Sequence, residues 1–224
     1  MVFSIPKLKP IAFFKRKECT VPTVLGWLAG VVLLLTVGII VILNIQSFLS
    51  PVDPKDADVL IVEGWLPDYA LESAAEEFKS HHYRLCIATG GPLEIGSYLS
   101  EHKSFADLAA LTLWKIGIDS ARIVAVRAPF VKKDRTYASS IAVRAWLDKS
   151  GSISTTFNVF SLGCHSRRSR MIFSRALGSK CSVGVIACDD RSYDSHRWWH
   201  YSSGLRTVVG EALVYVYALF FAMT

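Results

Sequence analysis

Apolar positions follow two different patterns along this chain. The first is a continuous apolar run over residues 24–43, inside a longer stretch from Cys19 to Val52 that contains no charged residue. The second begins near residue 58, where short apolar runs alternate with segments whose apolar residues recur at helical spacing. A helix rises about 1.5 Å per residue, so about 20 residues span the roughly 30 Å hydrocarbon layer of a bilayer. We therefore predict a transmembrane helix followed by a folded domain.

The domain is predicted to contain five short strands separated by helices. We expect strands over residues 59–62, 84–89, 122–126, 157–162 and 182–187, and helices over residues 68–80, 104–116, 136–148, 166–177 and 203–221. Because the strands are continuously apolar, both faces of the sheet should be covered by helices, as in parallel sheets. The sequence predicts an α/β fold with a doubly wound, mostly parallel, five-stranded Rossmann-like sheet, preceded by one N-terminal transmembrane helix.

The charged residues that flank the apolar run predict its orientation. Five Lys and Arg residues and one Glu precede the run, whereas Asp53, Asp56 and Asp58 follow it together with Lys55. By the positive-inside rule, the N-terminus is cytoplasmic and the domain is extracytoplasmic, or periplasmic. The run is longer than the apolar part of a cleaved signal peptide and lacks a convincing small-residue cleavage site. We expect a single-pass protein of the inner (plasma) membrane, with the lipid bilayer as one partner.

These patterns divide the chain into four parts. We expect a cytoplasmic basic tail over residues 1–21, a transmembrane signal anchor over 22–44, a stalk over 45–57 and a Rossmann-like domain over 58–224. The tail carries most of the formal charge of +6, so the domain is close to neutral. A nucleic-acid partner is therefore not expected, because such partners require a basic surface.

The cysteines of the domain leave its disulfide status open. They are Cys86, Cys164, Cys181 and Cys188. Disulfides are permitted outside the cytoplasm, but so low a density does not require them, and we expect buried thiols. Cys181 and Cys188 flank one predicted strand, which holds them roughly 23 Å apart at ~3.3 Å per residue, too far for a bond to each other.

Basic residues collect at the starts of two predicted helices, where the helix dipole disfavours cations. The first group precedes the helix whose N-cap we assign to Thr136 and consists of Lys132, Lys133 and Arg135. The second group, which contains His165 and Arg168, follows the predicted strand that ends at residue 162. Backbone N–H groups at a helix start bind anions, and guanidinium groups add forked donors. In a parallel α/β sheet, ligands bind at the carboxyl ends of the strands. The Gly90-Gly91 turn is expected at the same edge, because it follows the second predicted strand. The predicted anion-binding residues are Gly90, Gly91, Arg135, Thr136, His165 and Arg168.

The alternative for each of these basic side chains is a solvated position or a pair with a nearby acid. If the cluster does bind an anion, a phosphate, a pyrophosphate or a carboxylate would suit it.

The candidate catalytic residues are Glu63 and His165. Glu63 ends a buried strand at the predicted cleft and is either a general base or the partner of a nearby arginine. His165 is an anion donor, an acid/base group or a structural histidine. The sequence contains no dinucleotide fingerprint, P-loop, nucleophile elbow, zinc-protease helix or C-x-x-C motif. Neither a reaction nor a cofactor is therefore predicted.

A divalent metal ion is the less favoured interpretation of the acids after the fifth predicted strand. Asp189, Asp190 and Asp194 lie near His196, and a solvated loop with local capping is preferred, so no metal site is predicted.

The last predicted helix is apolar on almost every side. Residues 212–223 contain no charge, so this part is buried in protein or in lipid. Docking on the sheet, docking on the bilayer surface and a second membrane span are the alternatives, and Glu211 counts against the span. Trp198 and Trp199, just before the helix, either close a pocket, lie at the membrane interface or pack under the helix.

Several segments resemble the SanA/ElyC/YdcF-type family. They are VLIVEG, CIATGG, RTYASSIAVRAWL and above all SLGCHSRRSRMIFSRAL, within about residues 57–200. The stretch from His165 to Arg168 is the most specific part of the resemblance. It implies a Rossmann-like domain of unknown function, held outside the inner membrane and active in envelope and cell-wall precursor metabolism. The family pattern commonly has Glu-Asn after a Ser/Asn-Thr element; here Thr136 matches and the acidic neighbour does not.

Three functions are compatible with these features. The first is a membrane-anchored extracytoplasmic domain that binds an anionic, phosphorylated envelope intermediate, either free or lipid-linked. The second is a binder of S-adenosylmethionine or a similar nucleotide-type cofactor, which one cytoplasmic branch of the family suggests. The weak glycine pattern and the extracytoplasmic location both argue against it. The third is a non-catalytic membrane scaffold that uses Trp198, Trp199 and the last helix as a partner surface.

Overall fold

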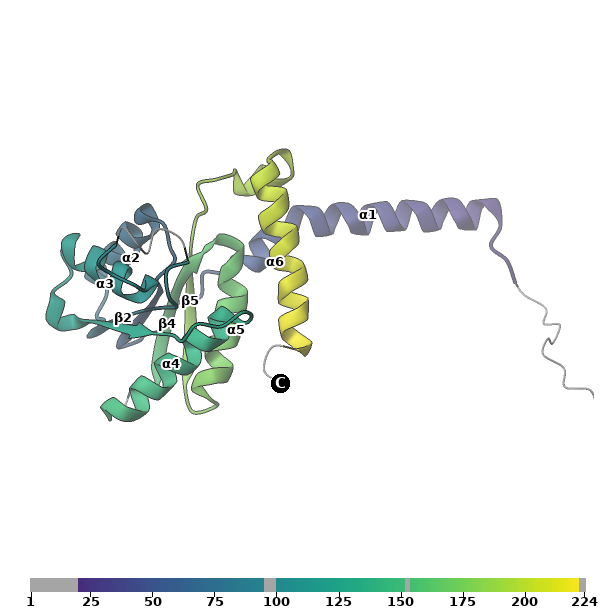
Figure 1. The fold of residues 1–224 in the computed structure, drawn as a ribbon. Helices are drawn as coiled ribbons and strands as arrows, with labels where there is room; N and C mark the ends of the chain where they lie inside the picture. Colours follow the sequence, from purple (N-terminus) through teal and green to yellow (C-terminus); the bar gives the residue numbers. More distant parts are fainter. Residues whose placement is uncertain (1–19, 95–99, 152–153, 222–224) are drawn as a thin grey trace, which may run out of the picture. The chain divides into compact units, whose positions relative to one another are not determined.

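The computed structural model describes residues 20–94, 100–151 and 154–221. The strands are β1 (Val59–Glu63), β2 (Leu85–Gly90), β3 (Ile123–Arg127), β4 (Thr156–Leu162) and β5 (Ser182–Cys188). The α-helices are α1 (Val24–Leu49), α2 (Asp68–Ser80), α3 (Phe105–Lys115), α4 (Arg135–Ser150), α5 (Ser166–Leu177) and α6 (Ser202–Phe220) (Figure 1). Three short 3₁₀ helices are η1 (Ser120–Arg122), η2 (Gly163–His165) and η3 (Ser195–His200). All five predicted strands and all six predicted helices are present.

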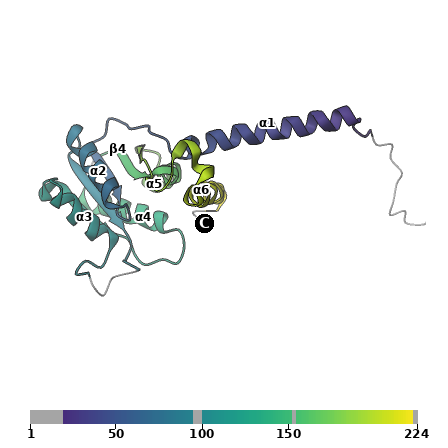
Figure 2. The same ribbon diagram turned by 90° about the horizontal axis from the view of Figure 1, so that it is seen from above.

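The strands form one parallel sheet in the order β3-β2-β1-β4-β5. Side chains alternate across β1, so this strand contributes to two cores. Leu60 and Val62 pack with α2 and α3, whereas Val59 and Ile61 pack with α4 and α5 on the other face. Figure 2 shows these four helices and the sheet from above. The predicted α/β fold with a doubly wound parallel sheet is therefore confirmed, and continuous apolar strands are what two covered faces require.

Helix α1 is long and apolar enough to cross a membrane, and α6 passes the same test of length and composition. α1 ends at Leu49, five residues after the end predicted for the anchor. The chain separates into a unit that ends at Ile40 and a second unit from Val41 onward, which contains the sheet. The basic tail predicted over residues 1–21 lies almost entirely outside the described residues.

Residues 45–57, expected as a stalk, are instead part of the folded unit. Asp53 forms an antiparallel bridge with Val185 on β5, through backbone hydrogen bonds of 2.9 and 3.1 Å. Buried Asn158 accepts a hydrogen bond from the Lys55 N–H and donates one to the Lys55 carbonyl, each of 2.8 Å. The segment thus covers the edge of β5, where unpaired backbone groups would otherwise be exposed.

The starts of α3 and α4 are capped differently. Ser104 caps α3, because its hydroxyl accepts a hydrogen bond of 3.1 Å from the Asp107 N–H. Thr136, however, is not the N-cap of α4: the helix begins at Arg135, after Asp134 in the left-handed conformation with φ 56°. Asp tolerates this conformation better than most residues, and the N-cap therefore lies at Asp134, two residues before the predicted position.

The four cysteines of the domain are free thiols, and Cys86 and Cys164 are buried. Burial raises the pKa of the Cys86 thiol to about 12, which keeps it protonated and unreactive.

Candidate functional site

A cavity of about 660 Å³ lies at the carboxyl ends of β1, β2 and β4, where the general rule for parallel α/β sheets places a ligand. Its walls come from the turn after β2, the loop before α4, the start of α5 and one side of α6. Glu63 lines the cavity, and so do all six predicted anion-binding residues: Gly90, Gly91, Arg135, Thr136, His165 and Arg168. Residues distant in the sequence are thus brought to one cavity.

Gly90 is required where it stands because α3 packs closely on the turn. A Cβ atom at Gly90 would lie 2.7 Å from the Cβ of Phe105, which is shorter than any normal contact. Gly91 has open space beside it, with the nearest atom 3.8 Å away, so its lack of a side chain contributes room to the cavity. The two glycines therefore have different roles, one in packing and one in leaving space.

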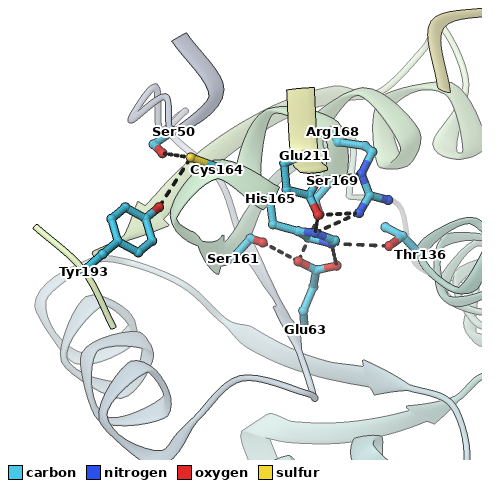
Figure 3. A network of polar contacts seen from close by, with 10 residues as sticks. All are labelled: Ser50, Glu63, Thr136, Ser161, Cys164, His165, Arg168, Ser169, Tyr193 and Glu211. Carbon is cyan, nitrogen blue, oxygen red and sulfur yellow. Dashed lines mark hydrogen bonds and ion pairs between the residues drawn. The ribbon is translucent and has the colours of Figure 1, made fainter. Parts of the chain in front are cut away.

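Glu63 is a buried carboxylate at the floor of the cavity, with a residue exposure of 3%. It ends β1 beside β4, and Ser161 on that strand donates a hydrogen bond to its Oε2. Ser169 on α5 donates a second bond to Oε2, at 2.9 Å (Figure 3). Burial by itself would raise the pKa of Glu63, but the His165 charge and these hydrogen bonds outweigh burial and lower it. Glu63 is therefore ionised at neutral pH.

His165 lies between two carboxylates. Its Nδ1 is 3.0 Å from Oε1 of Glu211, and its Nε2 is 3.6 Å from Oε1 of Glu63 (Figure 3). The Thr136 hydroxyl is 3.4 Å from the same Nε2. Burial and the nearby Arg168 charge would lower the pKa of His165, but the two carboxylates outweigh both and raise it from 6.5 to about 9. The imidazole is therefore protonated at neutral pH and both ring nitrogens are donors.

The position of His165 follows from the turn after β4. Gly163 adopts a positive φ of 43°, and a Cβ there would lie 3.3 Å from the Cβ of Asp190. Glycine permits this conformation, which leads the chain from β4 into η2 and then α5. The ring of Trp65 packs edge-on against His165, with centroids 4.9 Å apart, and holds it from the side of the turn after β1.

Arg168 is held by Glu211 in a bidentate pair. Its Nε donates to Oε2 at 2.9 Å and its Nη2 donates to Oε1 at 3.1 Å. Arg168 and His165 are three residues apart at the start of α5, which places both side chains on one face, and Nη2 lies 2.9 Å from Nδ1 of His165. Both cations therefore share the carboxylate of Glu211.

Charge in this network is balanced. Two cations, His165 and Arg168, face two carboxylates, Glu63 and Glu211, and the four groups are largely shielded from water. The pairs with acids that the sequence left open as an alternative are thus present. They also fix the direction of the donors, because Glu211 orients the guanidinium of Arg168.

Arg135 has a different environment from the other predicted residues. Its side chain lies at the rim of the cavity, 70% exposed, and pairs with Glu94 at 3.0 Å. Lys132 and Lys133 are exposed on the same loop. Exposed pairs of this kind are weak, so the rim retains a positive charge that can attract an anion from solution.

Sequence reasoning missed four residues of the site: Trp65, Ser161, Ser169 and Glu211. Glu211 had a usable signal, because a single acid in an otherwise apolar helix requires a partner when it is buried. The serines had none, since one serine in a strand or on a helix face is common.

The acids after β5 act locally. Asp194 accepts a hydrogen bond of 2.8 Å from the His196 N–H, and Asp190 accepts one of 2.9 Å from the Ser192 N–H. Within residues 20–94, 100–151 and 154–221, no group of three or more His, Cys, Asp or Glu side chains is arranged to hold a metal ion.

A larger hollow, of about 840 Å³, lies elsewhere, between α3 and β3. It contains none of the predicted site residues, and its lining mixes apolar side chains with polar and charged ones, among them the ion pair of Asp107 and Arg127. The smaller cavity is the candidate site, because it lies at the carboxyl ends of the central strands and the shielded ionised groups Glu63, His165, Arg168 and Glu211 converge there.

Comparison with models of protein families and with curated proteins gave no match to this chain. The fold and the site define its class: a Rossmann-like α/β domain with a charged cavity at the carboxyl edge of the sheet, preceded by a helix able to cross a membrane.

Proposed function

We propose that this protein is anchored in the inner membrane by α1 and binds an anionic, phosphorylated ligand in the cavity of its extracytoplasmic domain. The observation that carries the proposal is the convergence of the Gly90-Gly91 turn, the start of α4 and the protonated His165 on one cavity. Each of these features is suited to phosphate oxygens, and together they provide backbone and charged donors from three elements.

The start of α4 supports an anion in particular. No side chain caps this helix, since Asp134 makes no capping hydrogen bond, and Arg135 and Thr136 line the cavity. The first N–H groups of an α-helix have no partner within the helix and carry a partial positive charge. An anion placed there would accept hydrogen bonds from these groups.

The carboxylates give the site a means of holding its donors ready. Glu63 and Glu211 keep His165 protonated, and Glu211 fixes Arg168, so neither cation has to be reorganised when a ligand arrives. The exposed cations of the rim, Lys132, Lys133 and Arg135, would attract the ligand and contact its outer oxygens. Binding of this kind weakens as salt is added.

The family resemblance supports an envelope or cell-wall intermediate as the ligand. In this proposal the phosphate is carried either by a soluble nucleotide sugar or by a lipid. These sources share the same chemistry at the cavity, and a titration distinguishes them.

The test is calorimetric titration of the full chain, held in lipid nanodiscs, with a polyprenyl phosphate and separately with a nucleotide sugar. We expect saturable binding of at least one of them and a several-fold weaker affinity in Arg168→Lys, which keeps the charge but loses the forked geometry. Lys149→Ala is the matched control, because Lys149 is exposed at the other end of α4. Absence of binding to both ligands, or equal affinity in the Arg168 and Lys149 variants, would overturn the proposal.

A second candidate is cleavage of a phosphoester in the same cavity. It is favoured by the contact of His165 with Glu63 and Glu211, which keeps the imidazole protonated. Such an imidazole near a bound phosphate can donate its proton to the leaving oxygen as the bond from that oxygen to phosphorus breaks, while water attacks phosphorus and releases its proton to solvent. The test is release of inorganic phosphate by the full chain from an alkyl phosphate such as glycerol 3-phosphate, whose leaving oxygen needs a proton. Turnover that survives in His165→Gln would exclude this role for His165.

A further inference from the structure

Helix α6 exposes a continuous apolar surface along one side. Leu213 is 68% exposed and Phe220 is 73% exposed. The other large apolar residues on this surface are Leu205, Val209, Val216, Tyr217 and Leu219. No charged residue occurs from Ala212 to Phe220. Water-exposed surfaces of folded proteins seldom carry so large a contiguous apolar patch, so this side of α6 requires a partner.

The opposite side of α6 is fixed to the domain. Val208 and Ala218 are buried, and Glu211 pairs with Arg168 on α5. Gly204 packs so closely on the backbone of Trp198 that a Cβ there would lie 2.3 Å from the Trp198 carbonyl oxygen. The helix therefore cannot rotate to bury its apolar side against the sheet.

The end of α1 packs beside α6. Leu49 and Val208 belong to one buried cluster with Trp198, and the rings of Phe48 and Tyr215 are 5.8 Å apart in an edge-on contact. The indole Nε1 of Trp198 donates a hydrogen bond of 3.2 Å to the Ile42 carbonyl. The folded unit thus joins the apolar helix α1 at the same place where it presents the apolar side of α6.

We propose that α6 is a second contact with the membrane, lying along the bilayer surface with Leu213, Val216 and Phe220 in lipid. Lipid is the occupant because α1, which is continuous from Val24 to Leu49, would bring the bilayer to the cluster that holds α6. Aromatic residues at the start of the helix, Trp199 and Tyr201, suit the interfacial region. The inference rests on anchoring by α1, which is part of the proposed function, and not on the phosphorylated ligand.

The charges on the other side of α6 argue against a second membrane span. Glu211, Arg168, His165 and Glu63 form one network, and a spanning α6 would carry them into the hydrocarbon layer. A helix with one polar, protein-bound side and one apolar side lies in the interface plane instead. The same helix lines the cavity through Thr207, Glu211 and Val214, so the cavity would lie close to the lipid surface.

The test places a fluorescent NBD group on a cysteine at one position of the full chain, reconstituted in vesicles of phosphatidylethanolamine and phosphatidylglycerol. Cys19, Cys181 and Cys188 are first replaced by serine. The probe positions are Leu213→Cys on α6, Leu33→Cys on α1 as the membrane control and Glu76→Cys on α2 as the water control. All three side chains are exposed, so labelling removes no buried contact.

We expect lipids with a shallow nitroxide to quench the Leu213 probe, and iodide to quench it several-fold less than the Glu76 probe. The Leu33 probe should be quenched by a deep nitroxide. If iodide quenches the Leu213 probe as strongly as the Glu76 probe, the inference is overturned. If the deep nitroxide quenches the Leu213 probe as it quenches the Leu33 probe, α6 spans the membrane and the inference is also overturned. Protection from both quenchers would also overturn it and would identify a second copy or another protein as the partner. If Leu33 itself fails to respond to lipid quenchers, the anchor is wrong.

Discussion

The carboxylate of Glu211 on α6 accepts two hydrogen bonds from the guanidinium of Arg168 on α5, at 2.9 and 3.1 Å. This pair ties the last helix to the start of α5 at the wall of the cavity. It also supplies the carboxylate that contacts Nδ1 of His165. Glu211 therefore connects the docking of α6 to the protonation of His165 and the orientation of Arg168 in the candidate site.

Removal of Glu211 should destabilise the protein. Glu211→Ala leaves Arg168 without its counterion and His165 with Glu63 alone. Because both side chains are only slightly exposed, we expect a loss of about 3 kcal/mol in the free energy of unfolding. Thermal unfolding of the full chain in detergent micelles measures the change. Glu76→Ala, on the exposed side of α2, is the control and should change stability by less than about 0.5 kcal/mol.

A double variant separates charge from packing. Glu211→Leu with Arg168→Met should recover much of the lost stability, since replacing a buried pair by apolar residues of similar size is often neutral. It should still bind no phosphorylated ligand. Ligand affinity equal to that of the natural protein would contradict the role of Arg168.

Stability should fall as pH rises from about 6.5 to about 9. The pKa of His165 is raised from 6.5 to about 9 on folding, so its contribution is complete below pH 6.5 and is lost as the pH passes the pKa of the folded state. Folding lowers the pKa of Glu63 from 4.5, so its contribution to stability is present above pH 4.5 and is lost only as the pH falls below that value.

The midpoint of thermal unfolding as a function of pH measures this effect. His165→Gln should flatten the decline between pH 6.5 and 9, whereas His82→Gln, on an exposed residue, should leave it unchanged. Equal slopes in the natural protein and in His165→Gln would show that folding does not raise the pKa of His165.

The rim lysines should affect binding and not stability. Lys132→Ala with Lys133→Ala should weaken binding of a phosphorylated ligand several-fold and reduce its dependence on salt, because two exposed cations near the cavity are lost. The control is Lys115→Ala with Lys149→Ala, which removes the same charge from the ends of two helices. Calorimetry at two salt concentrations is the measurement. The same loss of affinity in both double variants would mean that total charge, and not the rim, attracts the ligand.

The two glycines after β2 should respond differently to alanine. Gly90→Ala places a methyl group 2.7 Å from the Cβ of Phe105 and should cost about 1–3 kcal/mol of stability by overpacking. Gly91→Ala meets nothing closer than 3.8 Å, so it should leave the unfolding midpoint nearly unchanged and reduce affinity by occupying cavity space. An unfolding midpoint lowered as much by Gly91→Ala as by Gly90→Ala would contradict these roles.

Local sequence features were sufficient for the strands, the helices and the parallel sheet. Runs such as Val59–Val62 are apolar at every position and short, which favours a strand covered on both faces, and segments with helical spacing separate one run from the next. The rule that parallel strands end at one edge then brought Gly90, Thr136 and His165 to the same cavity. Each of these inferences depends on residues close together in sequence or on topology.

Tertiary structure alone decided how those residues are used. The partner of Arg168 is 43 residues away, and nothing near either residue in the sequence specifies that α6 would bring Glu211 to it. Thr136 lost its expected capping role because Asp134 takes the left-handed conformation, and residues 53–55 became part of the domain because the edge of β5 needed backbone partners. Secondary structure is set by local spacing and composition, whereas ion pairs and edge pairing depend on which surfaces meet when the chain folds.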